Sequence, residues 1–524
     1  MRTLIMNHLA SSKLLPSIDS GANRRLARRE ARLTTDKVGK EDVVIDKSVR
    51  KALESYVWDK DDYASLVDHY RKLTLKDGLP FCSSLYQFSD LDKRLDGFRA
   101  EEVPNFGWNE HYRRGRERVR QRYLEANLRQ IQVKGDDDVL NLLPDLSTSS
   151  GWEGVLNPEH AKKAFLREDA FASYMEHVSE AKSKGSFGYP IVLGTRTQVT
   201  PAFDDLGNET EAKRQSRAVC ISNVWAVLAD KTVANPISEW YHSYSFVGHG
   251  KDDEWITHWH NLWRNRGYNH VTLDYSKFDS TQASWLIRDA LYIIREAFRY
   301  DENFDDELWK LIVEDKLNKV VCTGDGRVEL FTHGNTSGNG LTAVINDVVN
   351  EIILESAMDY AGITKFDYNV TGDDVSLFIS MSLPQLEETM ASLESWITHN
   401  LGIKVGESII CTWYENPKYL SRLWTFDGPY RHPKILVGKM LYPEKDRLHL
   451  YKNGVITPET IIYAYILGYE LGMRELMDVD RFLRDNNMSI GKLKVLSKEQ
   501  WKVLPYNVKE LYSKEIGYFI NKAA

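Results

Sequence analysis

The sequence of 524 residues has only four cysteines, and none stands at the close spacing of metal-binding or redox pairs. Folds held by disulfides need far more cysteine, so we expect a reducing compartment. No run reaches the ~18 apolar residues of a membrane span. Residues 1–16 lack an apolar core followed by a small-residue cleavage site. We therefore expect a soluble intracellular protein with no membrane partner.

The chain also lacks internal repeats, glycine- or serine-rich linkers and an excess of basic residues. Its 68 Lys+Arg against 76 Asp+Glu give a net charge of −8, which taken alone argues against a nucleic-acid-binding protein. Charged residues make up 27% and hydrophobic ones 42%, an ordinary globular composition that excludes bulk disorder. A chain of this length can bury a large core.

Basic residues are nevertheless concentrated locally. Residues 1–50 are basic on balance, and a second run contains Arg113, Arg114, Arg116, Arg118, Arg120 and Arg122. Basic stripes on helices can follow phosphates, but a helix face in solvent is an equally good explanation. Both interpretations of the second run stay open: a path for template or nucleotides, or a solvated helix.

Hydrophobic patterning predicts mixed helices and strands with antiparallel hairpins, so α+β suits better than a doubly wound sheet. Residues 1–140 and the last 75 read mainly as helix. Strands are predicted at 191–193, 218–221, 270–273, 320–322, 328–331, 366–370 and 375–379, and helices at 284–297, 340–360 and 386–401. The tryptophans and histidines between 255 and 270 are expected to be structural rather than a stacking or metal site.

Two carboxylates stand where phosphoryl-transfer chemistry would need them. Asp274 ends a predicted strand, and Asp373 lies at the tip of a predicted tight hairpin. Phosphoryl transfer needs aligned reactants and positive charge, which two divalent ions ~4 Å apart can supply. Mg²⁺ prefers oxygen ligands such as these carboxylates. Asp374 follows Asp373 and would face another direction in the pleat.

These residues resemble the palm motifs of viral RNA-dependent RNA polymerases. Asp274-Tyr-Ser-Lys-Phe-Asp279 resembles the first motif, Ser337-Gly338 with Thr342 and Asn346 the second, and Thr371-Gly372-Asp373-Asp374 the third. Flanking matches are Thr148-Ser149-Ser150-Gly151 for the template loop, Lys213, Arg214 and Arg217 for the basic finger motif, and Leu420-Ser421-Arg422 at the palm–thumb junction. The resemblance covers about residues 145–425 and is greatest to the picobirnavirus and partitivirus group of double-stranded RNA viruses.

The resemblance implies roles for these residues. Asp274 and Asp373 would bind two Mg²⁺ ions, with Mn²⁺ as an alternative, and Asp374 would assist. Asp279, Ser337 and Asn346 would hydrogen-bond the ribose hydroxyls, with Gly338 and Thr342 shaping that site. Lys213, Arg214 and Arg217 would neutralise the triphosphate. A fourth motif often supplies a lysine as general acid. Lys404 is the candidate here, although another register places Glu407 there and a solvent-facing lysine is an equal alternative.

The implied fold is a right hand of fingers, palm and thumb with a mainly antiparallel palm sheet. Expected boundaries are 1–140 for an N-terminal region that bridges fingers and thumb, 141–262 with 283–333 for fingers, 263–282 and 334–426 for palm, and 427–524 for thumb. Expected partners are RNA template and product, ribonucleoside triphosphates and viral capsid protein. The enzyme would act as a monomer in the host cytoplasm and inside the virion.

Three further hypotheses accompany the resemblance. The aromatic-containing segment Pro429–Gly454 could be an inserted loop that supports initiation without a primer. A catalytically silent RNA-binding or capsid-assembly relative is an alternative function, but it would be expected to have lost one of the aspartates or Asn346. A reverse transcriptase would be expected to carry an aromatic residue where this chain has Gly372, and a bulky residue where it has Asp279.

Overall fold

The computed structural model describes residues 45–75, 95–104, 109–143, 146, 148–166, 169–198, 202–210, 215–322, 328–443 and 447–487. The chain forms two compact units that alternate along the sequence. Unit 1 contains the described residues of 88–194 and 218–420, and unit 2 contains those of 33–87, 195–217 and 421–524. Each unit has an apolar core of its own.

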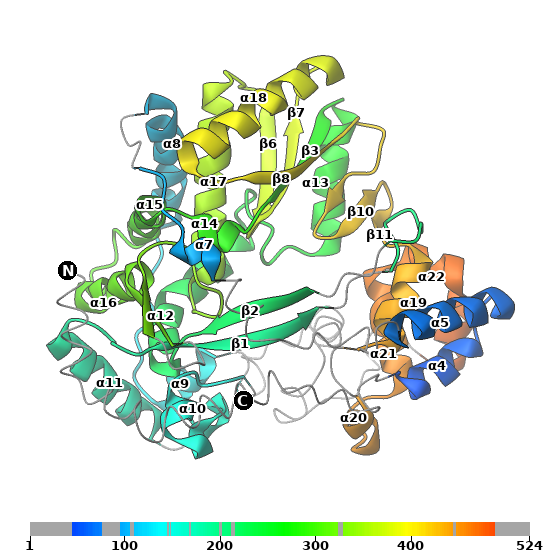
Figure 1. The fold of residues 1–524 in the computed structure, drawn as a ribbon, viewed down its shortest axis with the longest axis horizontal. Coiled ribbons are helices and arrows are strands. Elements are labelled where there is room, and N and C mark those ends of the chain that lie inside the picture. The colour runs from blue at the N-terminus through cyan, green and yellow to red at the C-terminus, as the bar shows by residue number, and fades with distance from the viewer. Residues whose placement is uncertain are drawn as a thin grey trace. The chain divides into compact units, whose positions relative to one another are not determined.

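The central sheet of unit 1 has four antiparallel strands in the order β6-β7-β3-β8 (Figure 1). The strands are β3 (Asn269–Tyr275), β6 (Phe366–Thr371), β7 (Asp374–Ile379) and β8 (Val405–Cys411). A two-residue turn joins β6 to β7, as the sequence predicted. Residues 375–379 of β7 are wholly buried because helices cover the sheet.

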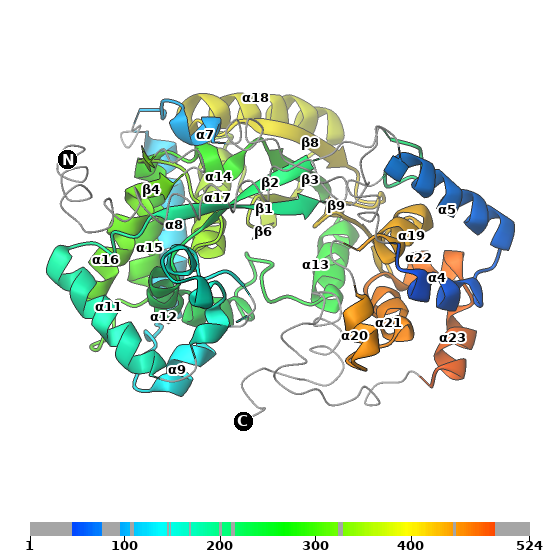
Figure 2. The ribbon, with the colours of Figure 1, turned by 60° about the horizontal axis from the view of Figure 1, so that its bottom comes forward.

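Three helices accompany this sheet, α13 (Asp253–Asn265), α17 (Thr342–Tyr360) and α18 (Leu383–Leu401). α18 contacts both β8 and α17, and both views show it along one side of the sheet (Figure 1, Figure 2). α17 is buried on every side from residue 344 to 358. A helix buried on all faces belongs to the interior of a domain. α17 is therefore a central helix of unit 1, and other elements of the unit pack against it.

A second sheet has the strand order β2-β1-β4-β5. Unit 1 contains β4, β5 and part of β1 and of β2. Its strands are β1 (Ile191–Gln198), β2 (Gln215–Ile221), β4 (Lys319–Cys322) and β5 (Val328–Phe331). β4 and β5 form the predicted hairpin, whose turn lies outside the described residues. The parallel pairing of β1 with β4, Ile191 opposite Val321, was not predicted. Parallel partners are far apart in sequence and leave no local turn signal.

The other elements of unit 1 are mainly helices. They are α7 (Asp96–Arg99), α8 (Glu110–Ala126), α9 (Asp136–Asn141), α10 (Glu153–Leu156), η3 (Pro158–His160), η4 (Lys163–Phe165), α11 (Ala170–Lys184), α12 (Val224–Tyr241), α14 (Phe278–Thr281), α15 (Ser284–Glu296), α16 (Asp306–Leu317) and the short strand β9 (Lys418–Tyr419). Most of these helices contribute hydrophobic side chains, with α17 and the central sheet, to the main core of unit 1. Trp152 and Val155 form a separate small cluster with Val192 and Cys322.

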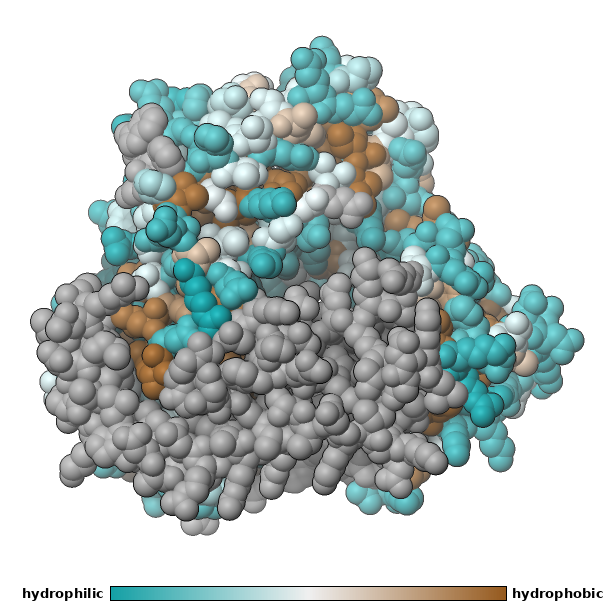
Figure 3. All heavy atoms as spheres, viewed as in Figure 1, coloured by the Kyte–Doolittle hydropathy of each residue, from teal (hydrophilic) through white to brown (hydrophobic). Residues whose placement is uncertain are grey.

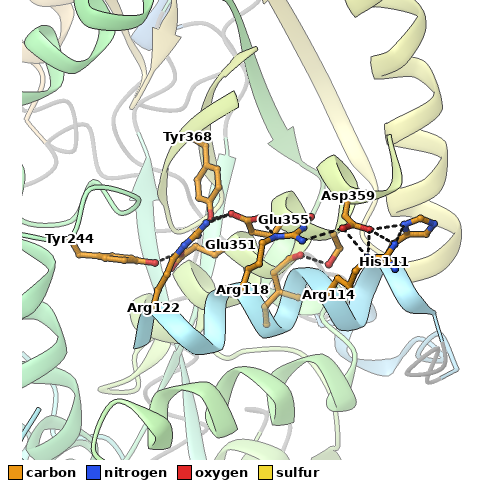
Figure 4. Close-up of polar contacts among 11 residues, drawn as sticks. His111, Arg114, Arg118, Arg122, Tyr244, Glu351, Glu355, Asp359 and Tyr368 are labelled. Atoms are coloured by element: carbon orange, nitrogen blue, oxygen red, sulfur yellow. Dashed lines mark hydrogen bonds and ion pairs between the residues drawn. The ribbon is translucent and has the colours of Figure 1, made fainter. Parts of the chain in front are cut away.

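Helix α8 packs against α17 through a ladder of ion pairs (Figure 4). Arginines one turn apart on α8 face carboxylates one turn apart on α17. The pairs join Arg114 to Asp359 at 2.7 Å, Arg118 to Glu355 at 2.7 Å, and Arg122 to Glu355 and, at 3.5 Å, to Glu351. Glu351 and Glu355 are almost fully buried, so the arginines neutralise charge inside the core.

The arginine run therefore has a role that neither interpretation from the sequence anticipated. Arg116 and Arg120 pair with Asp289 and Glu296 of α15, so five of the six arginines contact carboxylates of neighbouring helices. Arg113 alone of the six has an exposed side chain with no such pair recorded. The run attaches α8 to the core rather than presenting a basic stripe.

Arg122→Ala should lower the free energy of unfolding by about 3 kcal/mol, because truncating one partner of a buried pair leaves the other charge uncompensated. Arg113→Ala, the same change on the exposed side of the helix, should alter it by less than about 0.5 kcal/mol. Urea unfolding followed by circular dichroism measures both. Equal midpoints for the two variants would contradict the structural role of Arg122.

Unit 2 is mainly helical. Its elements are α4 (Lys47–Glu54), α5 (Lys60–Leu75), β10 (Arg422–Thr425), β11 (Gly428–Tyr430), α19 (Pro433–Leu441), α20 (Leu448–Lys452), α21 (Pro458–Gly468), α22 (Glu470–Leu476) and α23 (Val479–Asp485). α4 and α5 lie against α19, and α4 also against α21, although hundreds of residues separate them (Figure 1, Figure 2). The predicted helix start at Thr457 is confirmed, since its hydroxyl caps the Thr460 amide.

The expectation of an inserted loop at 429–454 is wrong. Its described residues contain α19 and α20, and α19 contributes Ile435, Leu436 and Met440 to the core of unit 2. Tyr442 is buried, and the Tyr451 hydroxyl donates to Asp46 at 2.5 Å. The aromatic content and the position of the segment suggested a loop, but its apolar residues at helical spacing pack inward.

The aromatic residues of α13 are structural, as expected. Trp259 is buried and donates to Asp367 at 3.2 Å. The Ser376 hydroxyl lies between His260 and His270, at 3.0 and 2.7 Å. Burial lowers the pKa of His270 to about 3, so this pair is neutral at ordinary pH.

The surface of the described residues is that of a globular fold. Hydrophilic side chains cover most of the described surface in Figure 3, and hydrophobic ones form small patches between them. Among the helices that the structure describes, none combines the length and hydropathy needed to cross a membrane.

Candidate active site

Asp274 and Asp373 lie at the same end of the central sheet. Leu273 of β3 stands opposite Val375 of β7, so Asp274 is adjacent to the start of β7. Thr371 pairs with Asp374, which leaves Gly372 and Asp373 as the turn. Gly372 has a φ of +64°, a left-handed conformation that favours glycine. Asp274 and Asp373 are exposed, and Asp374 is half-buried.

These carboxylates have the chemistry of a divalent-cation site. Two exposed aspartates supply hard oxygen donors, and Mg²⁺ in such sites is usually held by one or two carboxylates plus substrate phosphates. The described residues contain no group of three or more acidic, histidine or cysteine side chains arranged to hold a metal ion by themselves. In a site of this kind the remaining ligands of the ion would be substrate phosphates and water.

Asp279 is bound to Asn346 beside this edge. Asn346 is on α17 and donates from Nδ2 to Asp279 Oδ1 at 2.7 Å. Its own Oδ1 accepts from Gln282 and Asn335, each at 2.8 Å. The amide oxygen and the amide nitrogen thus have distinct partners, which fixes the orientation of Asn346. Gln282 and Asn335 were not identified from the sequence.

The loop with Ser337 and Gly338 is fastened to the second sheet. The Ser337 hydroxyl accepts from the Cys220 amide at 3.3 Å. Gly338 has a φ of +89°, and a Cβ there would come within 2.4 Å of the Cys220 carbonyl oxygen. Only glycine fits this contact. The Thr342 hydroxyl donates to the Thr336 carbonyl at 2.8 Å and so closes the loop onto the start of α17.

A buried acid anchors the same loop from α12. Asp230 accepts from the Gly340 amide at 2.9 Å and pairs with Lys316 at 2.9 Å. Burial raises the pKa of Asp230 to about 6, and the Lys316 ammonium opposes that shift. Neither residue was identified from the sequence, because nothing local indicates which buried acid contacts a distant loop.

Comparison with known families accounts for this arrangement. Residues 150–398 match the family model for viral RNA-dependent RNA polymerase, and this range includes Asp274, Asp279, Asn346, Asp373 and Asp374. The chain therefore carries a viral RNA-dependent RNA polymerase domain over just under half of its length, and the enzyme is an RNA-directed RNA polymerase, as the motifs indicated. A search of curated proteins gave no match.

Two solved polymerase structures share the fold. The RNA-dependent RNA polymerase of a human picobirnavirus aligns with a TM-score of 0.52 and 15% identity over 80% of this chain and 76% of that one. Its insertion-loop deletion mutant aligns with a TM-score of 0.56 and 14% identity over 84% of this chain and 86% of that one. The predicted α+β right-hand polymerase fold, and its likeness to the picobirnavirus enzyme, are confirmed.

Lys404 of this polymerase directly precedes β8. Its carbonyl accepts from the Ser276 amide at 2.9 Å, and its side chain is exposed. On β8, Glu407 stands opposite Asp274 in register. Of the two alternatives for the general acid, Glu407 therefore lies on the strand next to β3 and Lys404 lies just before that strand.

The predicted template loop is folded tightly. The Ser150 carbonyl accepts from the Val224 amide at 3.1 Å, and the Ser150 hydroxyl donates to the His160 carbonyl. Gly151 has a φ of +71°, and a Cβ there would come within 2.3 Å of the Ser222 carbonyl oxygen. Ser149 pairs with Lys162, and the Thr148 carbonyl accepts from the Lys163 amide at 3.0 Å. This loop is held by its backbone.

The structure describes the remaining predicted site residues only in part. Lys213 and Arg214 lie outside the described residues, and of Arg217 only the backbone, within β2, is described. Leu420 and Ser421 form a turn with φ of +54° and +56°. The Arg422 guanidinium lies 5.1 Å from the ring centre of Tyr469. The roles of these residues stay predictions.

Asn346→Ala or Asp279→Ala should raise the use of deoxyribonucleotides relative to ribonucleotides by about 10- to 100-fold. Loss of a hydrogen bond to a charged group costs about 1.5–3 kcal/mol, and each 1.4 kcal/mol is about tenfold. Single-nucleotide incorporation with paired ribo- and deoxyribonucleotide substrates measures the ratio. Ser356→Ala, on the same helix away from Asp279, is the control. Unaltered discrimination in both variants would remove these residues from sugar selection.

Proposed function

We propose that this polymerase replicates and transcribes a viral RNA genome by nucleotidyl transfer with two divalent metal ions, and that it can start without a primer. The observation that carries the proposal is the register of the central sheet, which sets Asp274 beside the turn that holds Asp373. Two carboxylates on adjacent strands are rigidly placed, as a site for phosphoryl transfer requires.

The acidic residues have distinct parts in this proposal. Asp274 and Asp373 would hold Mg²⁺, or Mn²⁺ in its place, with Asp374 assisting. When bound, such ions supply positive charge to the transferring phosphate. The chain itself aligns the reacting groups, because β3 and the β6–β7 turn are fixed to one another through the sheet.

The polar residues of α14 and α17 would select the sugar. Asp279 and Asn346 are already joined at 2.7 Å, and Ser337 lies in the loop that leads into α17. A ribose hydroxyl can take part in this network, whereas a deoxyribose leaves it one partner short. A site built for a hydroxyl rejects the analogue that lacks it. Lys213, Arg214 and Arg217 would neutralise the triphosphate.

Asp373→Ala should abolish RNA synthesis while leaving the fold and RNA binding intact, because the side chain is exposed at a turn and carries the proposed metal ligand. Radiolabelled nucleotide incorporation on a defined RNA template measures synthesis, and fluorescence anisotropy measures RNA binding. Asp137→Ala, an exposed aspartate of α9, is the matched control. Normal synthesis by the Asp373 variant would refute the proposal.

The same incorporation assay, run on different templates, tests whether the enzyme can start without a primer. Single- and double-stranded RNA templates, each with and without a primer, separate extension from primer-free starts. Product from unprimed template, with a 5′-terminal triphosphate, supports initiation without a primer. Product only from primed template would contradict it. Because 429–454 contains the helices α19 and α20, the proposal of primer-free initiation does not rest on an inserted loop there.

Lys404→Ala should slow single-turnover incorporation at saturating nucleotide if Lys404 protonates the leaving pyrophosphate. General acid catalysis typically contributes about 10²- to 10⁴-fold. Rapid-quench measurement gives the rate, and Lys365→Ala, an exposed lysine just before β6, serves as the control. An unchanged rate would exclude Lys404 and direct attention to Glu407.

The other proposals rest on the resemblance to viral polymerases. They are association with viral capsid protein, action in the host cytoplasm and inside the virion of a double-stranded RNA virus, and a monomeric enzyme. Co-sedimentation with capsid and size-exclusion chromatography would test them.

A further inference from the structure

The peptide units around Gly372 are held at both ends by α17. The Gly372 amide donates to Asp347 Oδ1 at 2.7 Å, and the Gly372 carbonyl accepts from Asn350 Nδ2 at 2.9 Å. Asp347 and Asn350 are three residues apart and therefore share one face of the helix. The Gly372 carbonyl belongs to the peptide that joins Gly372 to Asp373. The two contacts thus fix the backbone directly before Asp373.

Asp347 is itself held by a histidine from another segment. His249 Nδ1 lies 2.7 Å from Asp347 Oδ2, and the Asp347 side chain is fully buried. The Asp347 carboxylate raises the pKa of His249, which favours the charged partner for a buried acid. One oxygen of Asp347 thus faces the turn and the other faces His249. A buried carboxylate needs such partners to stay in place.

The sheet positions His249. The Val370 amide donates to the Phe246 carbonyl at 2.9 Å, and the Gly248 amide donates to the Val370 carbonyl at 2.8 Å. Residues 246–248 therefore extend the sheet along the outer edge of β6, directly before the turn. A Cβ at Gly248 would come within 2.4 Å of Thr371 Oγ1, so the backbone of the segment packs closely against the Thr371 side chain of the hairpin.

We infer that Asp347, supported by His249 and acting with Asn350, is a positioning residue that sets the location of Asp373 relative to Asp274. This inference rests on the proposed function, in which Asp373 is a metal ligand. Asp347 and Asn350 contact the turn, and His249 contacts Asp347. Misplacing a reacting group by about 1 Å can cost 10²-fold in rate.

The test compares four variants in the full-length enzyme. Asp347→Ala removes the acceptor, Asp347→Asn keeps an oxygen for the Gly372 amide, Asn350→Asp replaces the donor at constant size, and His249→Ala removes the support. Ser356→Ala is the control, since Ser356 is as buried on α17 but bonds only to the carbonyl of Ile352.

We expect kcat to fall at least tenfold in Asp347→Ala and Asn350→Asp, with RNA affinity and nucleotide KM within twofold of the parent. Asp347→Asn should keep most of the parental kcat, and His249→Ala should have a kcat between those of Asp347→Ala and Asp347→Asn. The Mn²⁺ concentration for half-maximal activity should rise as kcat falls, so it should be highest in Asp347→Ala and Asn350→Asp. A second readout without turnover is the shift in unfolding temperature that Mn²⁺ causes, which should shrink in the impaired variants.

Two results separate this inference from the proposed function. If Asp373→Ala is inactive while folded Asp347→Ala and His249→Ala keep the parental kcat and Mn²⁺ response, the positioning role is refuted and the proposed function stands. If Asp373→Ala is active, the proposed function itself fails. Should Asp347→Ala not fold, His249→Ala and Asn350→Asp decide the matter, and parental kcat in both overturns the inference.

Discussion

Polar side chains inside the buried helix α17 are the constraint on which unit 1 depends. Burying an amide or carboxylate without a partner costs several kcal/mol, and α17 buries Asn346, Asp347, Asn350, Glu351 and Glu355. Each must therefore find a hydrogen bond or a cation on a neighbouring element. Those neighbours are the first-motif turn, the β6–β7 turn and α8. The helix couples the positions of all three because it satisfies its own buried groups through them.

The same constraint explains how an acidic chain can be a polymerase. A net charge of −8 is a sum over the whole sequence, whereas RNA and nucleotides meet local charge. Arginines of α8, which the sequence left open as a path for RNA, instead neutralise buried carboxylates. In the proposed function, the basic residues of the finger motif would supply the charge for the triphosphate. Two exposed aspartates remain at the sheet edge.

Much of the centre of the fold could be predicted from the sequence. The Gly372-Asp373 turn between apolar runs predicted a hairpin, and the motif order predicted that Asp274 lies near it. Both predictions came from short-range turn chemistry combined with a specific arrangement of motifs. The side chains of Lys213, Arg214 and Arg217 lie outside the described part of the structure, so the roles expected for them stay predictions.

What the sequence did not reveal depends on contacts between distant segments. The pairing of Asp347 with His249 spans 98 positions, and no periodicity links them. The prediction for segment 429–454 was wrong because it rested on aromatic content and position and overlooked the short apolar helix α19. Asn346 and Asn350 stand four apart on a predicted helix and therefore share one face, but this spacing does not indicate that one contacts Asp279 and the other the Gly372 carbonyl.

The simultaneous contacts of Arg122 have a consequence for sequence variation. Its guanidinium reaches Glu351, Glu355 and the Tyr368 hydroxyl while lying 3.8 Å from the ring centre of Phe246. The single ammonium of a lysine cannot match a planar fork that also stacks on a ring. Because residues in one buried network do not contribute independently, positions 122, 351 and 355 should covary among descendants of this chain rather than drift singly.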